Sequence, residues 1–426
     1  MAIAPTDAAG GQRWTLTPTL TLSQAYTDNF RLSSANKQED WISSVSPGID
    51  LAVNEQTRGL FLSYSPSANF YQTHTQSNYL AHQGRLNGWS HLSGSTQLTI
   101  YDAFLRTEEP QTEATPDEEL ASQLGLQPDL TRRSSRQAYW QNTLGLSLAH
   151  RISPSRDLRL SYTFAVLNND DPEVQDNTRH SPGLSCSHQF DGKNRAGLGL
   201  DYTRGEFSGA SDTFSQYRPS LSYTHGFTQN LDGNLNYTHT IQDYSGKTPD
   251  YRIYHPTVGF SWRLAEDVPL SLNIGYFLQD RDSGDDKDGL TIGGDIGHGW
   301  RTRRSSLRIS ANSGYDQSFF GAENLGFNTF YQVMALGTHE LSRFSSASFN
   351  ASFRESDFVN DTSGRKDQAL SAGMDFNFSF VKVKWLRAGL SYRYRDLSSS
   401  ARGKDYAENR ITFSLSAVPT RPLPLN

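Results

Sequence analysis

The sequence has few of the features that mark soluble disulfide proteins, metalloproteins or helical membrane proteins. It contains one cysteine, Cys186, and three methionines among its 426 residues. A single cysteine excludes an internal disulfide and any metal or haem site that needs several thiolates. No run of 18 apolar residues occurs, so the sequence predicts no transmembrane helix. The first residues also show no charged and apolar secretory signal.

Clusters of basic residues are absent too. Lysine and arginine number 39 against 45 aspartates and glutamates, and no tract is rich in Lys or Arg. A nucleic-acid partner is therefore not expected. Only 35% of the residues are hydrophobic and the mean hydropathy is -0.63, which makes a large soluble core hard to build. Aromatic residues nevertheless reach 12% and there are 34 glycines, a composition that favours strands over helices.

One hairpin pattern occurs three times, and its copies contain Pro182, Pro219 and Pro256 at a constant interval. In the first copy, apolar residues alternate with small polar residues on both sides of the polar turn 191–193. This periodicity predicts two strands joined by a tight turn. We expect each proline to mark the place where a strand enters a membrane from its loop side. A proline is tolerated at a strand start or a bulge, where no N–H is needed for the ladder.

The same alternation runs through nearly the whole chain, from Trp14 to Leu415, and predicts about 20 strands. Short turns alternate with long polar loops. Because an open sheet of this size does not stay flat, we expect it to close into a barrel with a wide interior. The polar face lines that interior, so the apolar face must contact lipid.

The predicted fold is therefore all-β: a transmembrane antiparallel up-and-down β-barrel with short periplasmic turns and long extracellular loops. The expected organisation is a periplasmic N-terminal segment 1–13, the barrel 14–418 and a periplasmic C-terminal tail 419–426.

Charged residues interrupt the small polar residues of the predicted inner face. They are Arg159, Arg195, Asp201, Arg218, Asp232, Arg308, Asp375, Arg387 and Arg393. Their structural role would be cross-strand pairing in a water-filled lumen, and their functional role would be to steer charged solutes. The mixture of signs argues against a purely anion-selective or cation-selective pore.

The longest predicted loop, 107–135, is acidic. Its carboxylates are Glu108, Glu109, Glu113, Asp117, Glu118 and Glu119. One interpretation is a solvated outer loop, and the other is a segment that folds into the lumen as a constriction or gate.

Other motifs do not support catalysis or cofactor binding. Several histidines lie singly at strand ends, where they resemble an interfacial belt more than a metal site: His150, His188, His225, His298 beside Trp300, and His339. The aspartates of 280–288 miss the spacing of an EF-hand loop. No G-x-S-x-G motif occurs, so we expect no enzyme, no metal and no cofactor.

The N-terminal stretch "LTPTLTLSQAYTDNFRL…EDWISSVSPGIDLAV" resembles outer-membrane β-barrel porins, including those that accompany exopolysaccharide and PEP-CTERM/exosortase gene clusters. The matching pieces are Pro18, Tyr26-Thr27-Asp28-Asn29, Asp40-Trp41 and Val45-Ser46-Pro47-Gly48. The resemblance implies a Gram-negative outer-membrane protein that contacts outer-membrane lipid and is inserted by the barrel-assembly machinery. The C-terminus departs from such proteins, because a proline-rich tail follows the last alternating residues, Phe413 and Leu415.

Two functions remain open at this point. The first is a porin-like conduit for a polar solute, such as an exported exopolysaccharide. The second is a structural sheath whose lumen holds a partner: a multihaem cytochrome, as in a porin–cytochrome electron conduit, or a lipoprotein or polysaccharide-export protein.

Overall fold

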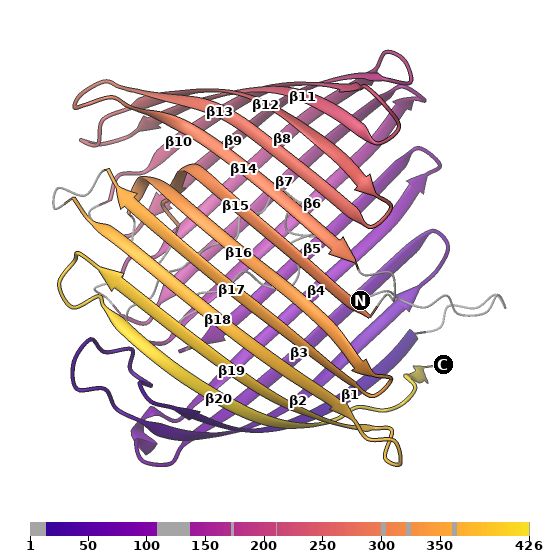
Figure 1. The fold of residues 1–426 in the computed structure, drawn as a ribbon, viewed down its shortest axis with the longest axis vertical. Helices are drawn as coiled ribbons and strands as arrows, with labels where there is room; N and C mark the ends of the chain where they lie inside the picture. The colour runs from indigo at the N-terminus through magenta and orange to yellow at the C-terminus, as the bar shows by residue number, and fades with distance from the viewer. Residues whose placement is uncertain are drawn as a thin grey trace.

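The computed structural model describes residues 14–108, 137–171, 174–209, 211–299, 304–320, 325–359 and 364–425. Twenty long strands form one antiparallel sheet in which each strand pairs with the next, and β1 also pairs with β20, so that the sheet closes (Figure 1). The strands of the wall are β1 Trp14–Thr27, β2 Asp40–Asn54, β3 Arg58–Tyr71, β4 Tyr79–Ser93, β5 Thr96–Thr107, β6 Tyr139–Ser153, β7 Arg156–Asn169, β8 Asn177–Gln189, β9 Asn194–Phe207, β10 Phe214–Gly226, β11 Leu231–Tyr244, β12 Tyr251–Ala265, β13 Val268–Arg281, β14 Lys287–Gly299, β15 Ser305–Ser318, β16 Gly326–Ser342, β17 Ser345–Phe358, β18 Lys366–Ser379, β19 Leu386–Ser399 and β20 Tyr406–Ala417. The predicted barrel of about 20 strands is confirmed.

Two short elements complete the described chain. A 3-10 turn covers Thr75–Ser77, and the short strand β21, Leu423–Leu425, pairs with the first residues of β1. Within the described ranges no helix is long and apolar enough to cross a membrane. The start of β1 and the strand β21 therefore lie side by side at one end of the barrel.

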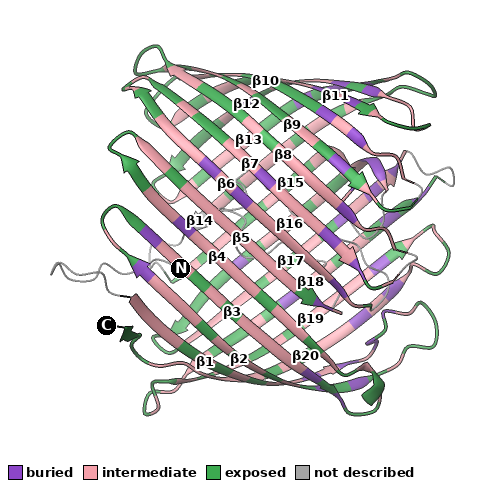
Figure 2. Cartoon of the chain, turned by 180° about the vertical axis from the view of Figure 1, so that it is seen from behind, coloured by how far each residue is buried: buried purple, intermediate pink, exposed green. Residues whose placement is uncertain are grey.

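The two faces of the wall differ as the alternation predicts. In β9, Leu198 and Leu200 lie on the outer face and are 65% and 47% exposed, while the neighbouring Gly197 and Gly199 belong to the inner face. Most of the wall is exposed or intermediate (Figure 2), since each strand has lipid on one side and the lumen on the other. Buried apolar side chains gather instead in three clusters near the strand ends that carry the long loops.

The three repeated prolines correct one expectation. Each lies inside its strand and not at a strand start, and the register does not shift there, so none marks a bulge. Pro182, Pro219 and Pro256 pair with the preceding strand but are skipped in the ladder with the following strand. A proline has no N–H to donate, so the ladder tolerates it by a short interruption on one side.

Long loops are fastened to the strands that precede them by aspartates. The backbone N–H of Asn169, the last residue of β7, donates to Asp176, and the last residues of β11 and β19 do the same with Asp250 and Asp405. Each carboxylate satisfies an N–H where the strand ladder ends. These three aspartates therefore hold the described loop residues beside the last ladder bonds of β7, β11 and β19.

The closing seam between β1 and β20 depends on the residues that carry the family resemblance. The side-chain amide and backbone N–H of Asn409 both donate to the carboxylate of Asp28, at 2.8 Å each. The hydroxyl of Thr27 donates to Glu408 at 2.7 Å, and Asn29 donates to the carbonyl oxygen of Ala407. This motif therefore joins the first strand to the last at the long-loop rim.

Candidate functional site

The structure places all nine candidate lumen charges at inward-facing positions of their strands. Two cross-strand ion pairs form among them or with a neighbour: Arg308 with Asp295 at 2.7 Å, and Arg393 with Asp375 at 3.0 Å. These pairs fit the structural role considered for such charges. Whether the nine residues steer solutes stays a prediction.

The remaining candidates are distributed over three regions of the wall. Arg218 on β10 lies opposite Asp201 on β9 in the strand register. Asp232 is the first inward-facing residue of β11, directly after the β10–β11 turn. Arg387 is the first inward-facing residue of β19. Arg159 and Arg195 line a groove of about 680 Å³ at the short-turn end of the lumen.

The groove is built from small residues of β8 to β11 with arginines at its sides. In strand register, Ser185 lies between Arg159 and Gly199, and Ser187 is followed across the sheet by Gly197 and Ser222. A Cβ atom on either glycine would lie 2.5–2.6 Å from a serine hydroxyl of β10. The two glycines therefore leave space above the inner wall that a larger residue would fill. The repeated Ser and Gly residues of the hairpin pattern thus have a structural meaning: they hollow the inner wall.

Three arginines line the groove, and two of them, Arg159 and Arg195, donate to serine hydroxyl groups. The guanidinium of Arg159 donates to Ser147 Oγ at 3.3 Å, and that of Arg195 donates to Ser187 Oγ at 2.8 Å. The one lining carboxylate, Asp157, forms an exposed ion pair with Arg151 at 3.6 Å. Among the described residues that line the groove, arginines therefore outnumber carboxylates.

The turn that precedes Arg195 is rigid. The carboxylate of Asp191 accepts hydrogen bonds from the side-chain amide of Asn194 and from the backbone N–H groups of Lys193 and Asn194. These bonds hold the pKa of Asp191 below its usual range, with the Asn194 amide as the largest cause. The turn is thus tied down at neutral pH, which fixes the position from which Arg195 projects.

A second feature of the lumen was not predicted from the sequence. β15 stops pairing with β14 after Ser313, although β14 continues to Lys287 beside β13. The segment that follows packs on the inner face of strands that are not its neighbours in the sheet. We refer to its described residues, 314–320 and 325–328, as the strap.

Aromatic side chains fasten the strap to the inner wall. The ring of Tyr315 lies 4.9 Å from that of Phe277 on β13, and the ring of Phe319 lies 4.9 Å from that of Phe214 on β10. Phe327 is fully buried in the same cluster. Burying such rings is favourable by roughly 1.5–3 kcal/mol each, so the contact is stable.

Buried polar groups fix the position of the strap. The side-chain amide of Gln317 donates to Tyr251 Oη at 2.7 Å, and Gln216 donates to Gln317 Oε1 at 2.8 Å and to Gln242 Oε1 at 2.7 Å. Hydrogen bonds of this kind depend on geometry, so they select one arrangement of the packed surfaces.

Two further contacts anchor the strap at opposite sides. Arg354 on β17 forms an ion pair with Asp316 at 2.9 Å. On the far side, the guanidinium of Arg179 on β8 lies over the ring of Phe320 at 4.9 Å, and the amide of Asn177 donates to the carbonyl oxygen of Phe320. The strap thus overlies the inner wall from β13 to β8 at the long-loop end.

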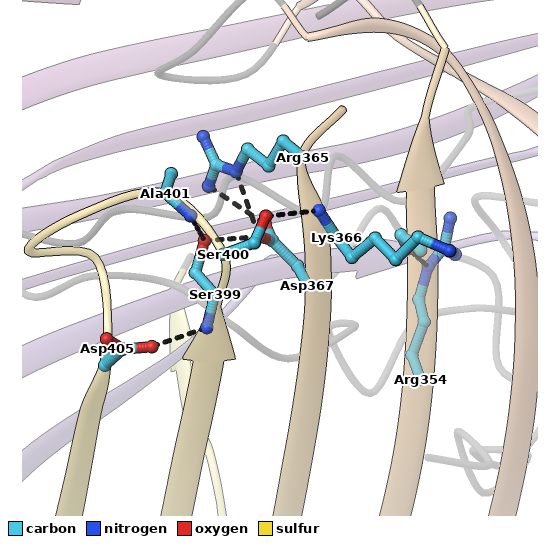
Figure 3. A network of polar contacts seen from close by, with 9 residues as sticks. Arg354, Arg365, Lys366, Asp367, Ser399, Ser400, Ala401 and Asp405 are labelled. Atoms are coloured by element: carbon cyan, nitrogen blue, oxygen red, sulfur yellow. Dashed lines mark hydrogen bonds and ion pairs between the residues drawn. The ribbon is translucent and has the colours of Figure 1, made fainter. Parts of the chain in front are cut away.

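The rim beside the strap is held by a polar network (Figure 3). Arg365 forms two 2.9 Å bonds to the carboxylate of Asp367, and the hydroxyl of Ser399 donates to the same carboxylate at 2.6 Å. The network joins β18 to β19 and the loops above them. Because Arg365 and Asp367 are both buried, removing either would leave a buried charge without its main partner.

Loop 28–39 also turns inward. Phe30 packs with Ile42 and Tyr71 on the inner face of β2 and β3, and Leu32 packs with Leu397 and Tyr406 near the seam. The strap and this loop both reduce the width of the long-loop end of the lumen.

Most of the acidic loop that was considered as a gate lies outside the described residues. Glu108 directly follows β5, but Glu109, Glu113, Asp117, Glu118 and Glu119 lie outside the described residues. The gate therefore stays a prediction. Most of the strap lies in one of the long polar loops that the sequence predicts. Its signal in the sequence is the group Phe319, Phe320 and Phe327 inside a polar loop.

Metal binding has no support within the described part of the chain, where no group of three or more His, Cys, Asp or Glu side chains is placed to hold an ion. Four histidines of the predicted belt, His150, His188, His225 and His339, lie at outward-facing positions near the short turns. His188 and His225 stack edge-on with Phe190 and Phe227, at 4.6 and 4.8 Å between ring centroids.

A closed antiparallel barrel with an apolar outer band and a polar interior can be satisfied only in a lipid bilayer. The chain is a transmembrane β-barrel of the outer membrane. No family model and no curated protein matches its sequence.

Solved structures with a similar strand arrangement are outer-membrane proteins. They include the outer membrane protein OpdK from Pseudomonas aeruginosa (11% identity, TM-score 0.42, 95% of this chain and 99% of that chain), OpdQ from Pseudomonas aeruginosa (13%, 0.41, 97% and 98%) and a BenF-like porin from Pseudomonas fluorescens Pf-5 (12%, 0.44, 96% and 99%). Identities and TM-scores of this size do not carry function from those proteins to this chain.

Proposed function

We propose that this barrel is a passive, non-enzymatic channel for polar solutes whose long-loop opening is narrowed by the strap. The observation that carries the proposal is the docking of the strap on the inner wall through Phe319, Phe327 and Gln317. A barrel of 16–18 strands already leaves an aqueous channel, so a barrel of 20 strands needs such a restriction to limit leakage.

The rival functions differ in what they require of the lumen. A sheath around a cytochrome or lipoprotein requires room for a folded partner, and the strap occupies part of that room. An exported polysaccharide is a flexible polar chain that needs only a hydrated path, so export of such a polymer is a more specific form of the proposed function. Insertion by the barrel-assembly machinery and the association with exopolysaccharide gene clusters stay predictions.

The direct test is single-channel conductance in planar bilayers. We expect steady ohmic current from the purified protein, and a larger conductance when residues 315–328 are replaced by a short Gly-Ser linker. A parallel variant lacking 109–136 tests the acidic loop as the restriction instead. The proposal fails if the wild-type protein, shown to be folded by its heat-dependent mobility in detergent gels, does not conduct after any co-purifying protein has been removed.

Current that appears only after such a partner is removed would favour the sheath. Haem absorbance in the material before separation would identify a cytochrome as the occupant.

A further inference from the structure

The ladder between β14 and β15 is incomplete at the long-loop end. β14 begins at Lys287, but its pairing with β15 covers only Ile292 to Gly299. Among the described residues, 287–291 pair with β13 on one side and with no strand on the other. β14 and β15 therefore diverge towards the long loops (Figure 1). Backbone N–H and C=O groups on such an edge lack the partners that a closed barrel wall normally supplies.

The hairpin that carries the strap matches this edge in register. The last pair between the two strands joins Ile292 to Ser313. Continuing the same register places Leu290 opposite Tyr315. β15 and β16 stay paired with each other as far as Ser318, so the hairpin can move as one unit. Pairing with β14 would extend the ladder over 287–291 without shifting the register of any strand.

The side chains that fasten the docked strap belong to the lipid-facing side of this hairpin. In β15, alternation continues from the outward Ile309 to Tyr315 and Gln317. Phe327 of β16 lies opposite Gln317 and is on the same side. Docking turns this side onto the inner wall, whereas pairing with β14 would turn it to the membrane beside Leu290. Aromatic residues near the membrane interface are typical of transmembrane barrels, so the same side chains suit both positions.

Contacts on the other side of the hairpin are internal to β15, β16 and β17. Asp316 of β15 and Arg354 of β17 form the 2.9 Å ion pair, and Arg354 also donates to Asn328 of β16 at 3.4 Å. These three strands are consecutive in the sheet. The bonds can therefore persist while the hairpin moves relative to β8–β13.

Docking leaves buried polar groups without partners. The side chain of Gln279 on β13 is fully buried, and neither its Oε1 nor its Nε2 has a hydrogen-bond partner within the described chain. Gln279 lies opposite Ile253, a member of the cluster on which the strap packs. Nε2 of Gln242 is buried without a partner as well. Both glutamines project from the inner wall, so undocking would expose them to the water of the lumen and remove this cost.

We propose that the strap is a reversible gate with two positions. In the docked position, which is the more populated, it narrows the lumen. In the second position, the hairpin pairs with β14, completes the wall and leaves the long-loop opening wide. Burial of aromatic rings favours docking, whereas the added ladder bonds and the hydration of the glutamines favour the second position. This inference rests on the proposed channel function and adds how the channel is regulated.

The test uses a disulfide that only the second position allows. Lys287 lies opposite Ser318 in the extended register. In the docked position, the next residue, Phe319, packs on Phe214 of β10, which is four strands from β14 and thus roughly 15–20 Å away at the spacing of strands in a sheet. A disulfide needs Cα atoms within about 7 Å of each other. Lys287→Cys/Ser318→Cys is made in a Cys186→Ser background, so that no other thiol is present.

We expect an oxidant to cross-link this pair, and the cross-linked channel to show a larger and steadier conductance that returns to the starting value on reduction. Ile292→Cys/Ser313→Cys joins residues that are already paired and is the positive control, which should cross-link without changing the conductance. Gly289→Cys/Ser318→Cys is out of register and is the matched control. It should cross-link about tenfold more slowly, because a diagonal pair lies farther apart.

The inference is overturned if the positive control cross-links and Lys287→Cys/Ser318→Cys does not, or if its cross-link leaves the conductance unchanged. Equal rates for the in-register and out-of-register pairs overturn it too, because they indicate random contact and not strand pairing. Absence of current from the wild-type protein would instead contradict the proposed channel function. Each variant is first shown to be folded by its heat-dependent mobility in detergent gels.

A second measurement needs no disulfide. Gln279→Leu keeps a similar volume but removes the polar atoms that docking buries without partners. The docked position becomes more stable, so the fraction of time that a single channel spends at high conductance should fall about tenfold or more. Gln83→Leu, at an exposed inward position of β4, is the control. A fraction that stays the same or rises in Gln279→Leu would contradict the balance on which the gate depends.

Discussion

At the scale of single residues, Gln317 is the side chain that fixes the strap in one position. It connects the fully buried Tyr251 to Gln216, and so links the strap to β12 and β10. We expect Gln317→Ala to destabilise strap docking by about 1–3 kcal/mol, because Tyr251 and Gln216 lose a partner inside a buried cluster. Single-channel recordings should then show larger or noisier currents. Gln83→Ala, at an exposed inward position of β4, is the control and should leave the current unchanged. If the current of Gln317→Ala were the same as that of the wild type, the aromatic contacts alone would hold the strap.

At the scale of elements, the seam between β1 and β20 is the contact on which barrel closure depends. Asp28→Ala removes the acceptor of two Asn409 donors at 2.8 Å. We expect the free energy of unfolding to fall by about 2 kcal/mol, because hydrogen bonds to a charged group are lost. The temperature at which the barrel unfolds in detergent, read from its mobility shift on a gel, should fall. Asp285→Asn in the exposed 282–286 loop serves as the control. An unchanged unfolding temperature for Asp28→Ala would mean that backbone pairing alone closes the seam.

The faces of the strands can be predicted from the sequence, whereas the position of the strap cannot. Alternation along one strand depends on neighbours in sequence, so Leu198 and Leu200 on one face and Gly197 and Gly199 on the other were predictable. The position of the strap depends on contacts between β15–β16 and β8–β13, which no local pattern encodes. Its three phenylalanines lie in a stretch with a polar composition. Alternation within a strand does not indicate that such a loop packs on the inner wall. A proline has no N–H for the ladder, so the sequence favours a strand start for each of the three prolines. The structure shows that a strand also tolerates a proline in its interior, where pairing with one of the two neighbouring strands is interrupted.

At the scale of the whole molecule, the balance of inward charges predicts the selectivity of the channel. Several carboxylates of the inner wall form ion pairs with arginines, including Asp295 with Arg308, Asp375 with Arg393 and Asp316 with Arg354. Arg195, by contrast, is bonded to a serine hydroxyl. The chain as a whole has a net charge of -6, so its overall charge and its lumen predict opposite preferences. Fixed charges lining a narrow aqueous path act more strongly on passing ions than charges on outer loops, which salt screens.

We therefore expect a moderate preference for anions, measured as the reversal potential across a potassium chloride gradient. The preference should be moderate because several inner charges are paired, and it should weaken as salt concentration rises. The double variant Arg159→Gln/Arg195→Gln should shift the reversal potential towards zero. Arg343→Gln, in the exposed turn between β16 and β17, should leave it in place. A preference for cations in the wild type would show that the acidic outer loops, and not the arginines of the inner wall, determine which ions enter.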